Sequence, residues 1–160
     1  TAYDIRIANA LMSAYIKEDS LQKARELRKC ACHRGAKPNA KTWEIFLEHY
    51  LKAREITFAV NCIERAIAVG RGDGSKWVPC ADVVNSVMGY FEESKDVDGA
   101  EAFLETVKKA VDEVAVGVYE SLIRTYEASG KTSPMARRLK MENIEVSDAC
   151  KKSLEVINKE

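Results

Sequence analysis

Apolar residues recur at intervals of three and four along most of the chain, which is the spacing of one face of an α-helix. Four segments open such a stripe with a similar run of residues, at 7–12, 42–47, 83–88 and 118–123. Their first residues are separated by 35, 41 and 35 positions. One helical pattern that returns at a nearly constant interval indicates a repeat protein.

A second apolar stripe follows each of these segments after a short polar turn, and it again keeps helical spacing. Small residues recur in the first turn of the predicted second helices, at Ala24, Ala59 and Ala100. Such side chains let two helices approach to the short end of the usual separation of about 8–10 Å. Each repeat is therefore predicted to be a pair of closely packed antiparallel helices.

One helix pair cannot bury its apolar face alone, so neighbouring pairs must stack. We therefore predict an all-α fold: a right-handed α-solenoid of about four helix-turn-helix pairs plus a C-terminal helix, with no strand at 40–69 or 81–110. Six aromatic residues are expected to be mostly buried: Trp43, Phe46, Tyr50, Phe91, Phe103 and Tyr126.

The pattern divides residues 1–160, taken as a single helical-repeat segment, into five parts. These are repeat one at 5–39, repeat two at 40–80, repeat three at 81–115, a degenerate repeat four at 116–146, and a capping or partial helix at 147–160. The chain opens with Thr1 rather than methionine, so we expect a segment of a longer or processed protein.

Repeat two is six residues longer than its neighbours, and the excess lies in the glycine-rich stretch 70–76. Alternating glycines disfavour helix propagation, so this stretch is predicted to be a loop. It lacks both a preceding strand and the spacing of a phosphate-binding loop. Its expected role is a flexible connection between repeats.

Composition and charge narrow the choice of partners. Hydrophobic residues make up 46% and charged residues 31% of the sequence, as in ordinary folded domains. No apolar run reaches the ~18 residues of a membrane span, so no membrane partner is expected. The net charge is zero, but residues 1–80 carry 14 basic and 9 acidic residues, whereas residues 81–160 carry 11 and 16. Any nucleic-acid surface is therefore expected in the first half.

The five cysteines are odd in number and scattered, which indicates reduced thiols in an intracellular or organellar compartment. Cys30 and His33 share a helix face, but two ligands do not make a zinc site, so no metal is predicted. His49 has no nucleophile or acid in a catalytic arrangement and is interpreted as a packing residue. The protein is thus expected to bind rather than catalyse, without a cofactor.

The run 9–15, followed by Lys17, Leu21, Ala24 and the closing Gly-Ala-Lys-Pro-Asn of 35–39, closely resembles one pentatricopeptide repeat. The run 119–126 with 129–131 does so as well, and the resemblance to P-type-like plant organellar arrays covers nearly the whole chain. Repeats three and four lack the closing Gly-x-x-Pro. The tetratricopeptide opening motif is missing, which makes that family the weaker match.

The family resemblance implies that each repeat meets one base of single-stranded RNA through two side chains. Repeat one supplies Asn9 and Asn39, a pair that the family code reads as cytosine, with uracil second. Repeat two supplies Glu44 with Cys80, which is a departure from the code, since a carboxylate and a thiol are poor partners for a base. The base-reading candidates are therefore Asn9, Asn39, Glu44, Asn85 and Glu120.

The same frame places candidates that flank the base or touch phosphate at Arg6, Lys17, Lys41 and Lys52. Simpler interpretations remain for the base-reading set. Asn9 and Asn85 also suit helix starts, and Glu44 and Glu120 also suit solvent or a basic neighbour.

The resemblance leaves two functional classes open. One is an organellar single-stranded RNA-binding protein that acts in RNA metabolism or translation, in the mitochondrion or alternatively the chloroplast. The other is a helical scaffold that binds protein partners within an organellar ribosome or another ribonucleoprotein.

Overall fold

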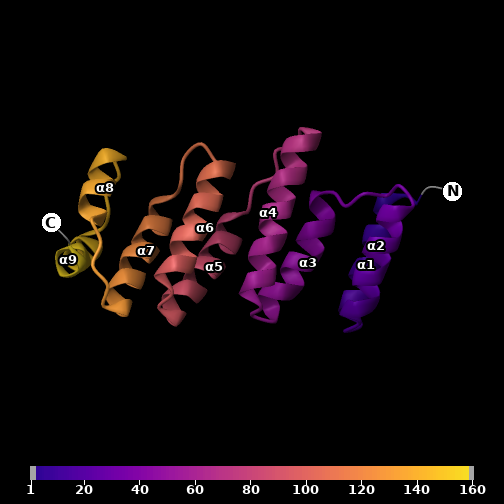
Figure 1. The fold of residues 1–160 in the computed structure, drawn as a ribbon, viewed down its shortest axis with the longest axis horizontal. Coiled ribbons are helices and arrows are strands. Elements are labelled where there is room, and N and C mark those ends of the chain that lie inside the picture. Colours follow the sequence, from indigo (N-terminus) through magenta and orange to yellow (C-terminus); the bar gives the residue numbers. More distant parts are fainter. Residues whose placement is uncertain (1–2, 159–160) are drawn as a thin grey trace. The chain divides into compact units, whose positions relative to one another are not determined.

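The computed structural model describes residues 3–158, and every regular element in that range is an α-helix (Figure 1). The all-α fold of helix pairs is confirmed, and neither 40–69 nor 81–110 contains a strand. The helices are α1 (Ile5–Lys17), α2 (Leu21–His33), α3 (Ala40–Lys52), α4 (Ile56–Asp73), α5 (Ala81–Ser94), α6 (Val97–Ala110), α7 (Val116–Ser129), α8 (Met135–Met141) and α9 (Asp148–Ile157).

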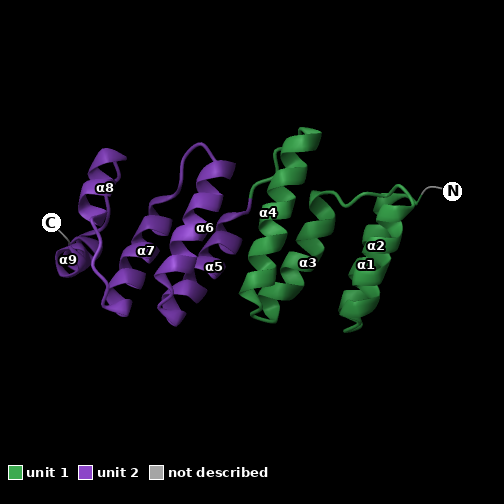
Figure 2. Ribbon diagram, in the orientation of Figure 1, with its two compact units in different colours: residues 1–78 green, residues 79–160 purple. Residues whose placement is uncertain are grey.

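The chain forms two compact units, which meet in sequence between Val78 and Pro79 (Figure 2). Unit 1 holds α1 to α4: α1 packs on α2, α3 packs on α4, and α1 also packs on α3. Unit 2 holds α5 to α9: α5 packs on α6 and α7, and α7 packs on α6 and α9. The exact repeat limits given above stay a prediction.

Side chains fix where several helices begin. The first turn of a helix has backbone N–H groups without a partner in the helix, and a polar residue just before it can accept from them. Asp4 accepts from Arg6 N at 2.8 Å before α1, and Asp96 accepts from Gly99 N at 2.9 Å before α6. Before α3, Asn39 and Thr42 form a reciprocal capping box.

Large apolar side chains meet across small ones in both units. Ala24 and Ala59 in unit 1 and Ala100 in unit 2 are fully buried, which fits the close helix approach expected from their size. Phe46 and Phe103 are the largest fully buried side chains. Fully burying such a side chain stabilises a fold by roughly 1.5–3 kcal/mol.

Five of the six aromatic residues expected in the core are buried, and Tyr126 differs because it is only half-buried. Its hydroxyl donates to Glu101 Oε2 at 2.5 Å, and Glu101 is itself partly exposed. A buried phenol needs a hydrogen-bond partner, and here the partner keeps the ring near the surface.

The prediction of a loop over 70–76 is wrong in its first half, because α4 continues to Asp73 and ends at Gly74 in the left-handed conformation (φ 79°). Gly70 is buried, and a Cβ atom on it would lie 2.6 Å from the backbone nitrogen of Trp77. The glycine therefore permits a close approach of two chain segments within unit 1, and it does not break the helix.

None of the helices in the described part of the chain combines the length and apolar character that crossing a bilayer requires.

Candidate nucleic-acid interface

A groove runs between α1 and α3 of unit 1 and encloses about 830 Å³. We call it the α1/α3 groove. It gathers six of the nine side chains that the sequence singled out, which are separated by up to 46 positions along the chain. They are Arg6, Asn9, Lys17, Asn39, Lys41 and Lys52, and the other lining residues are Ala10, Ser13, Ile16, Ile45, Glu48 and His49.

Helical spacing explains why these residues meet. The α1 lining residues Arg6, Asn9, Ser13 and Lys17 follow one another at steps of three and four, and the α3 lining keeps the same steps. Because α1 packs on α3, these two stripes form the walls of one groove. The repeat therefore brings corresponding residues of successive first helices side by side.

Asn9 and Asn39, which stand 30 residues apart, lie in contact at one edge of the groove. Asn9 Nδ2 donates to Asn39 Oδ1 at 3.1 Å. Thr42 Oγ1 donates to Asn9 Oδ1 at 2.7 Å, and Thr42 N donates to Asn39 Oδ1 at 3.1 Å. A base that read this pair would have to use the remaining N–H groups of the two amides or displace part of this network.

The same network assigns structural roles to the two asparagines. Asn39 is the N-cap of α3, and Asn9 is only 7% exposed and supports that cap from α1. Thr42 is fully buried and was missed by the sequence interpretation. The Asn-x-x-Thr spacing before an apolar run would have identified it as a capping box.

Two lysines of the groove pair loosely with acids, whereas Arg6 forms a hydrogen-bonded ion pair. Lys41 Nζ lies 3.8 Å from Glu44, and Lys52 Nζ lies 3.8 Å from Glu48. Arg6 binds Asp4 at 2.9 Å with its own side chain 86% exposed, and hydrogen bonds from Arg6 lower the pKa of the Asp4 carboxyl. Exposed lysine–carboxylate pairs such as those of Lys41 and Lys52 contribute about 0–1 kcal/mol, so they would compete only weakly with a phosphate.

Glu44 lies outside the lining of the groove. Its Oε1 accepts from Trp77 Nε1 at 2.5 Å, and its Oε2 faces Lys41. The carboxylate thus ties the segment after α4 to α3, all within unit 1.

The two candidates in unit 2 lie in different surroundings. Asn85 is exposed on α5. Glu120 on α7 accepts from the backbone N–H of Ser147 at 2.9 Å, and this hydrogen bond lowers the pKa of the Glu120 carboxyl. Glu120 therefore helps to fix the start of α9.

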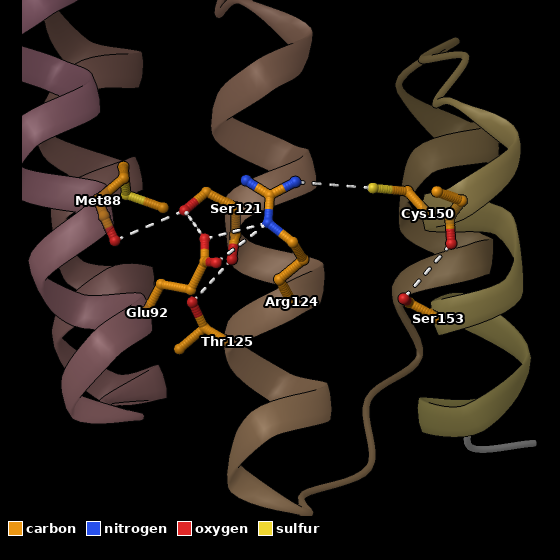
Figure 3. A network of polar contacts seen from close by, with 8 residues as sticks. Met88, Glu92, Ser121, Arg124, Thr125, Cys150 and Ser153 are labelled. Carbon is orange, nitrogen blue, oxygen red and sulfur yellow. Dashed lines mark hydrogen bonds and ion pairs between the residues drawn. The ribbon is translucent and has the colours of Figure 1, made fainter.

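A second polar network, absent from the sequence interpretation, joins α5 to α7 (Figure 3). Arg124 Nε donates to both carboxylate oxygens of Glu92 at 3.1 Å, and Ser121 Oγ donates to Glu92 Oε1 at 3.0 Å. Arg124 Nη1 also lies 3.9 Å from Cys150 Sγ on α9. The one arginine on α7 is thus held by a carboxylate of the neighbouring helix.

All five cysteines are free thiols. Within residues 3–158, no group of three His, Cys, Asp or Glu side chains could hold a metal ion.

Comparison with known proteins adds the evidence of sequence similarity. No family model matches the chain. It is 48% identical, over 161 residues and 100% of its length, to the large ribosomal subunit protein mL101 (rPPR4) of Arabidopsis thaliana. Two mitochondrial pentatricopeptide repeat-containing proteins of the same plant are 30% and 31% identical over 98% and 91% of the chain. The matches cover 33%, 29% and 28% of these relatives, so the chain spans about a third of their length.

Proposed function

Because this chain belongs to the pentatricopeptide repeat family, we propose that its α1/α3 groove binds single-stranded RNA within a mitochondrial ribonucleoprotein. The observation that carries the proposal is the composition of the groove. Four cationic side chains and two amides from successive first helices line one continuous surface. Cations follow a phosphate backbone and amides can hydrogen-bond an exposed base edge.

In this proposal the protein binds mainly to the phosphate backbone of the RNA. The three lysines and Arg6 lie at the surface, and the ion pairs of Lys41 and Lys52 are loose. Asn9 and Asn39 already hydrogen-bond to each other, and Asn39 also caps α3. Glu44 already accepts a hydrogen bond from Trp77. Base preference is therefore weak and confined to repeat one, where the family code favours cytosine and then uracil.

The relatives support the wider setting of the proposal. One relative is named as a protein of a large ribosomal subunit, and others are named as mitochondrial. We place this chain in the same kind of particle and in the mitochondrion rather than the chloroplast. It acts there by binding, with no catalytic step.

Contacts with protein partners are the second candidate, and unit 2 favours them. Its helix α5 carries Asp82 and Glu93 at the positions where α1 and α3 carry basic residues, and Arg124 on α7 is already paired. A surface of this charge suits protein neighbours better than phosphate, so one particle would use unit 1 for RNA and unit 2 for protein.

Binding of homopolymer RNA at a series of salt concentrations tests the RNA proposal. Lys17→Ala/Lys52→Ala should lower the salt slope of binding by about 0.7 for each phosphate that no longer meets a lysine. The matched control is Lys131→Ala/Lys152→Ala, which removes two exposed lysines of unit 2. A slope equal to that of the control would contradict phosphate binding in the α1/α3 groove.

Competition between oligonucleotides that differ at one base tests the reading of repeat one. Asn39→Asp keeps a capping side chain before α3 and should move the preference from cytosine toward uracil. Equal binding of all four bases by the wild-type protein would rule out base reading and leave backbone contact alone.

A further inference from the structure

Unit 1 has a second groove, between α2 and α4, which encloses about 730 Å³ and shares no lining residue with the first. We call it the α2/α4 groove. Its lining contains five basic side chains, and none of its described lining residues is an aspartate or a glutamate. The basic residues are Arg25, Arg28, Lys29, Lys37 and Arg65.

Aromatic rings hold two of the arginines in place. The guanidinium carbon of Arg28 lies 4.8 Å from the centre of the Trp43 ring and 4.6 Å from that of Phe46. The guanidinium carbon of Arg65 lies 5.1 Å from the centre of the same Trp43 ring. Stacking occupies the face of a guanidinium and leaves its N–H edge free to bind phosphate in a fork.

Two of these arginines donate hydrogen bonds to neutral partners. Arg25 donates to Tyr50 Oη at 2.6 and 3.1 Å, and Arg65 donates to Asn61 Oδ1 at 3.0 Å. Burial lowers the pKa of Arg28, and the charges of Arg25 and Arg65 act in the same direction. The groove therefore concentrates positive charge in a partly desolvated place, where an anion would relieve the repulsion.

An exposed ring stands among these charges. Phe58 is 50% exposed, and it stacks on Tyr50 with the ring centres 5.2 Å apart and the planes 23° apart. Both residues line the groove. An open aromatic face beside arginines is a platform for an unpaired base. An acidic peptide would use the charges but would leave this ring exposed, so the combination favours RNA.

We propose that the α2/α4 groove is a second RNA-binding site, which takes a single-stranded segment with phosphates on Arg28, Arg65 and the rim lysines and one base on Phe58. Its arginines and Phe58 lie on the second helices, and none of its lining residues is one that the repeat code uses. It does not rest on RNA binding by the α1/α3 groove, and one protein could hold two RNA segments through the two grooves.

The test uses the whole chain carrying Lys17→Ala/Lys52→Ala, so that the α1/α3 groove has lost two of its four cations. Fluorescence anisotropy with labelled single-stranded oligouridine measures affinity over a series of salt concentrations. The first variant adds Arg28→Gln/Arg65→Gln. The second adds Lys29→Gln/Lys37→Gln, which changes only exposed side chains and leaves the packing intact. The matched control adds Lys23→Gln/Lys76→Gln, two exposed lysines of unit 1 outside both grooves.

Each groove variant should lower the salt slope by about 1.4, because it removes two cations that each neutralise one phosphate of a single strand. Phe58→Ala should weaken binding about fivefold or more with an unchanged slope, since it removes stacking and no charge. The control should leave both slope and affinity unchanged.

Three outcomes would overturn the proposal. In the first, the lysine variant behaves like its control. In the second, Lys17→Ala/Lys52→Ala alone abolishes oligouridine binding, which would leave the α1/α3 proposal standing. In the third, polyglutamate of equal charge displaces oligouridine as well as unlabelled oligouridine does, which would identify the partner as an acidic protein segment.

Discussion

Units 1 and 2 are both built from packed α-helices, but their first helices carry different charges at corresponding surface positions. At the start and end of their first helices, α1 and α3 carry Arg6 with Lys17 and Lys41 with Lys52. At the corresponding positions, α5 carries Asp82 with Glu93, and α7 carries Gly117 with Ala128. These residues stand at the surface, so their exchange leaves the core unchanged. The stacking of helix pairs and the binding surface can therefore vary independently.

The polar networks of the two units extend the contrast. In unit 1, Asn9, Asn39 and Thr42 satisfy one another, and the basic residues around them stay exposed. In unit 2, Glu92 takes up the one arginine of α7. The basic residues of the α1/α3 groove are thus accessible to a ligand, whereas Arg124 in unit 2 joins two neighbouring helices.

Core truncation should show that the two scaffolds are equally well packed. Phe46→Ala in unit 1 and Phe103→Ala in unit 2 should each lower the free energy of unfolding by about 3–5 kcal/mol, because each removes a fully buried ring. Urea denaturation followed by circular dichroism measures this. A loss below about 1 kcal/mol in one unit only would show that this unit is loosely packed.

Breaking the hydrogen-bond network of Asn9, Asn39 and Thr42 should give the next largest loss of stability. Thr42→Val keeps the shape of the side chain but removes the hydroxyl that bonds Asn9, so it should cost about 1–3 kcal/mol of stability. Thr57→Val, at an exposed position of α4, is the matched control and should stay within about 0.5 kcal/mol of wild type. Equal losses in the two variants would mean that the network contributes nothing.

Helical periodicity was sufficient to predict the fold, because the stripes that define each helix are the residues that become buried. Val84, Val87 and Met88 in unit 2, for example, lie on one predicted face and are buried together. The limit of α4 was missed because Gly70 was read for its backbone freedom. Its actual role depends on Trp77, and the approach of the two cannot be seen in a local pattern.

Helical spacing also predicted part of the candidate site. A repeat frame carries Lys17 and Lys52 to one groove from spacing alone. The frame gives no information about which groups hydrogen-bond to each other. Trp77 Nε1 donates to the Glu44 carboxylate, and the backbone N–H of Ser147 donates to the Glu120 carboxylate. The α2/α4 groove was missed because its arginines belong to the second helices, for which the resemblance supplied no role.

Alkaline titration should identify Tyr126, which occupies the same position of its repeat as Tyr50. Tyr50 accepts from Arg25, whereas Tyr126 donates to Glu101. Burial and the bond to Glu101 raise the pKa of Tyr126 to about 12 from the ordinary 10.0. The folded state then keeps a proton that the unfolded state loses, so stability falls as pH rises from about 10 to 12.

Tyr126→Phe should reduce this alkaline loss of stability, measured by urea denaturation at several pH values. Tyrosinate absorbance of the folded protein should show one late-titrating group fewer in the same variant, while Tyr119, whose pKa burial also raises, remains. An unchanged number of late-titrating groups in Tyr126→Phe would contradict the assignment.

The smallest effect should come from the ion pairs themselves, and it bears most directly on the contrast between the basic α1/α3 groove and the Glu92–Arg124 network of unit 2. A double-mutant cycle of Glu92→Gln and Arg124→Gln should give a coupling of about 0.2–1 kcal/mol, because the two side chains are 32% and 48% exposed. The corresponding cycle for Glu48 and Lys52, at 3.8 Å and with side chains 74% and 80% exposed, should lie at or below the lower end of that range. High salt should weaken both couplings. If the Lys52 pair proved the stronger, its ammonium group would be held as firmly as Arg124, and the contrast between an open basic groove and a closed network would fail.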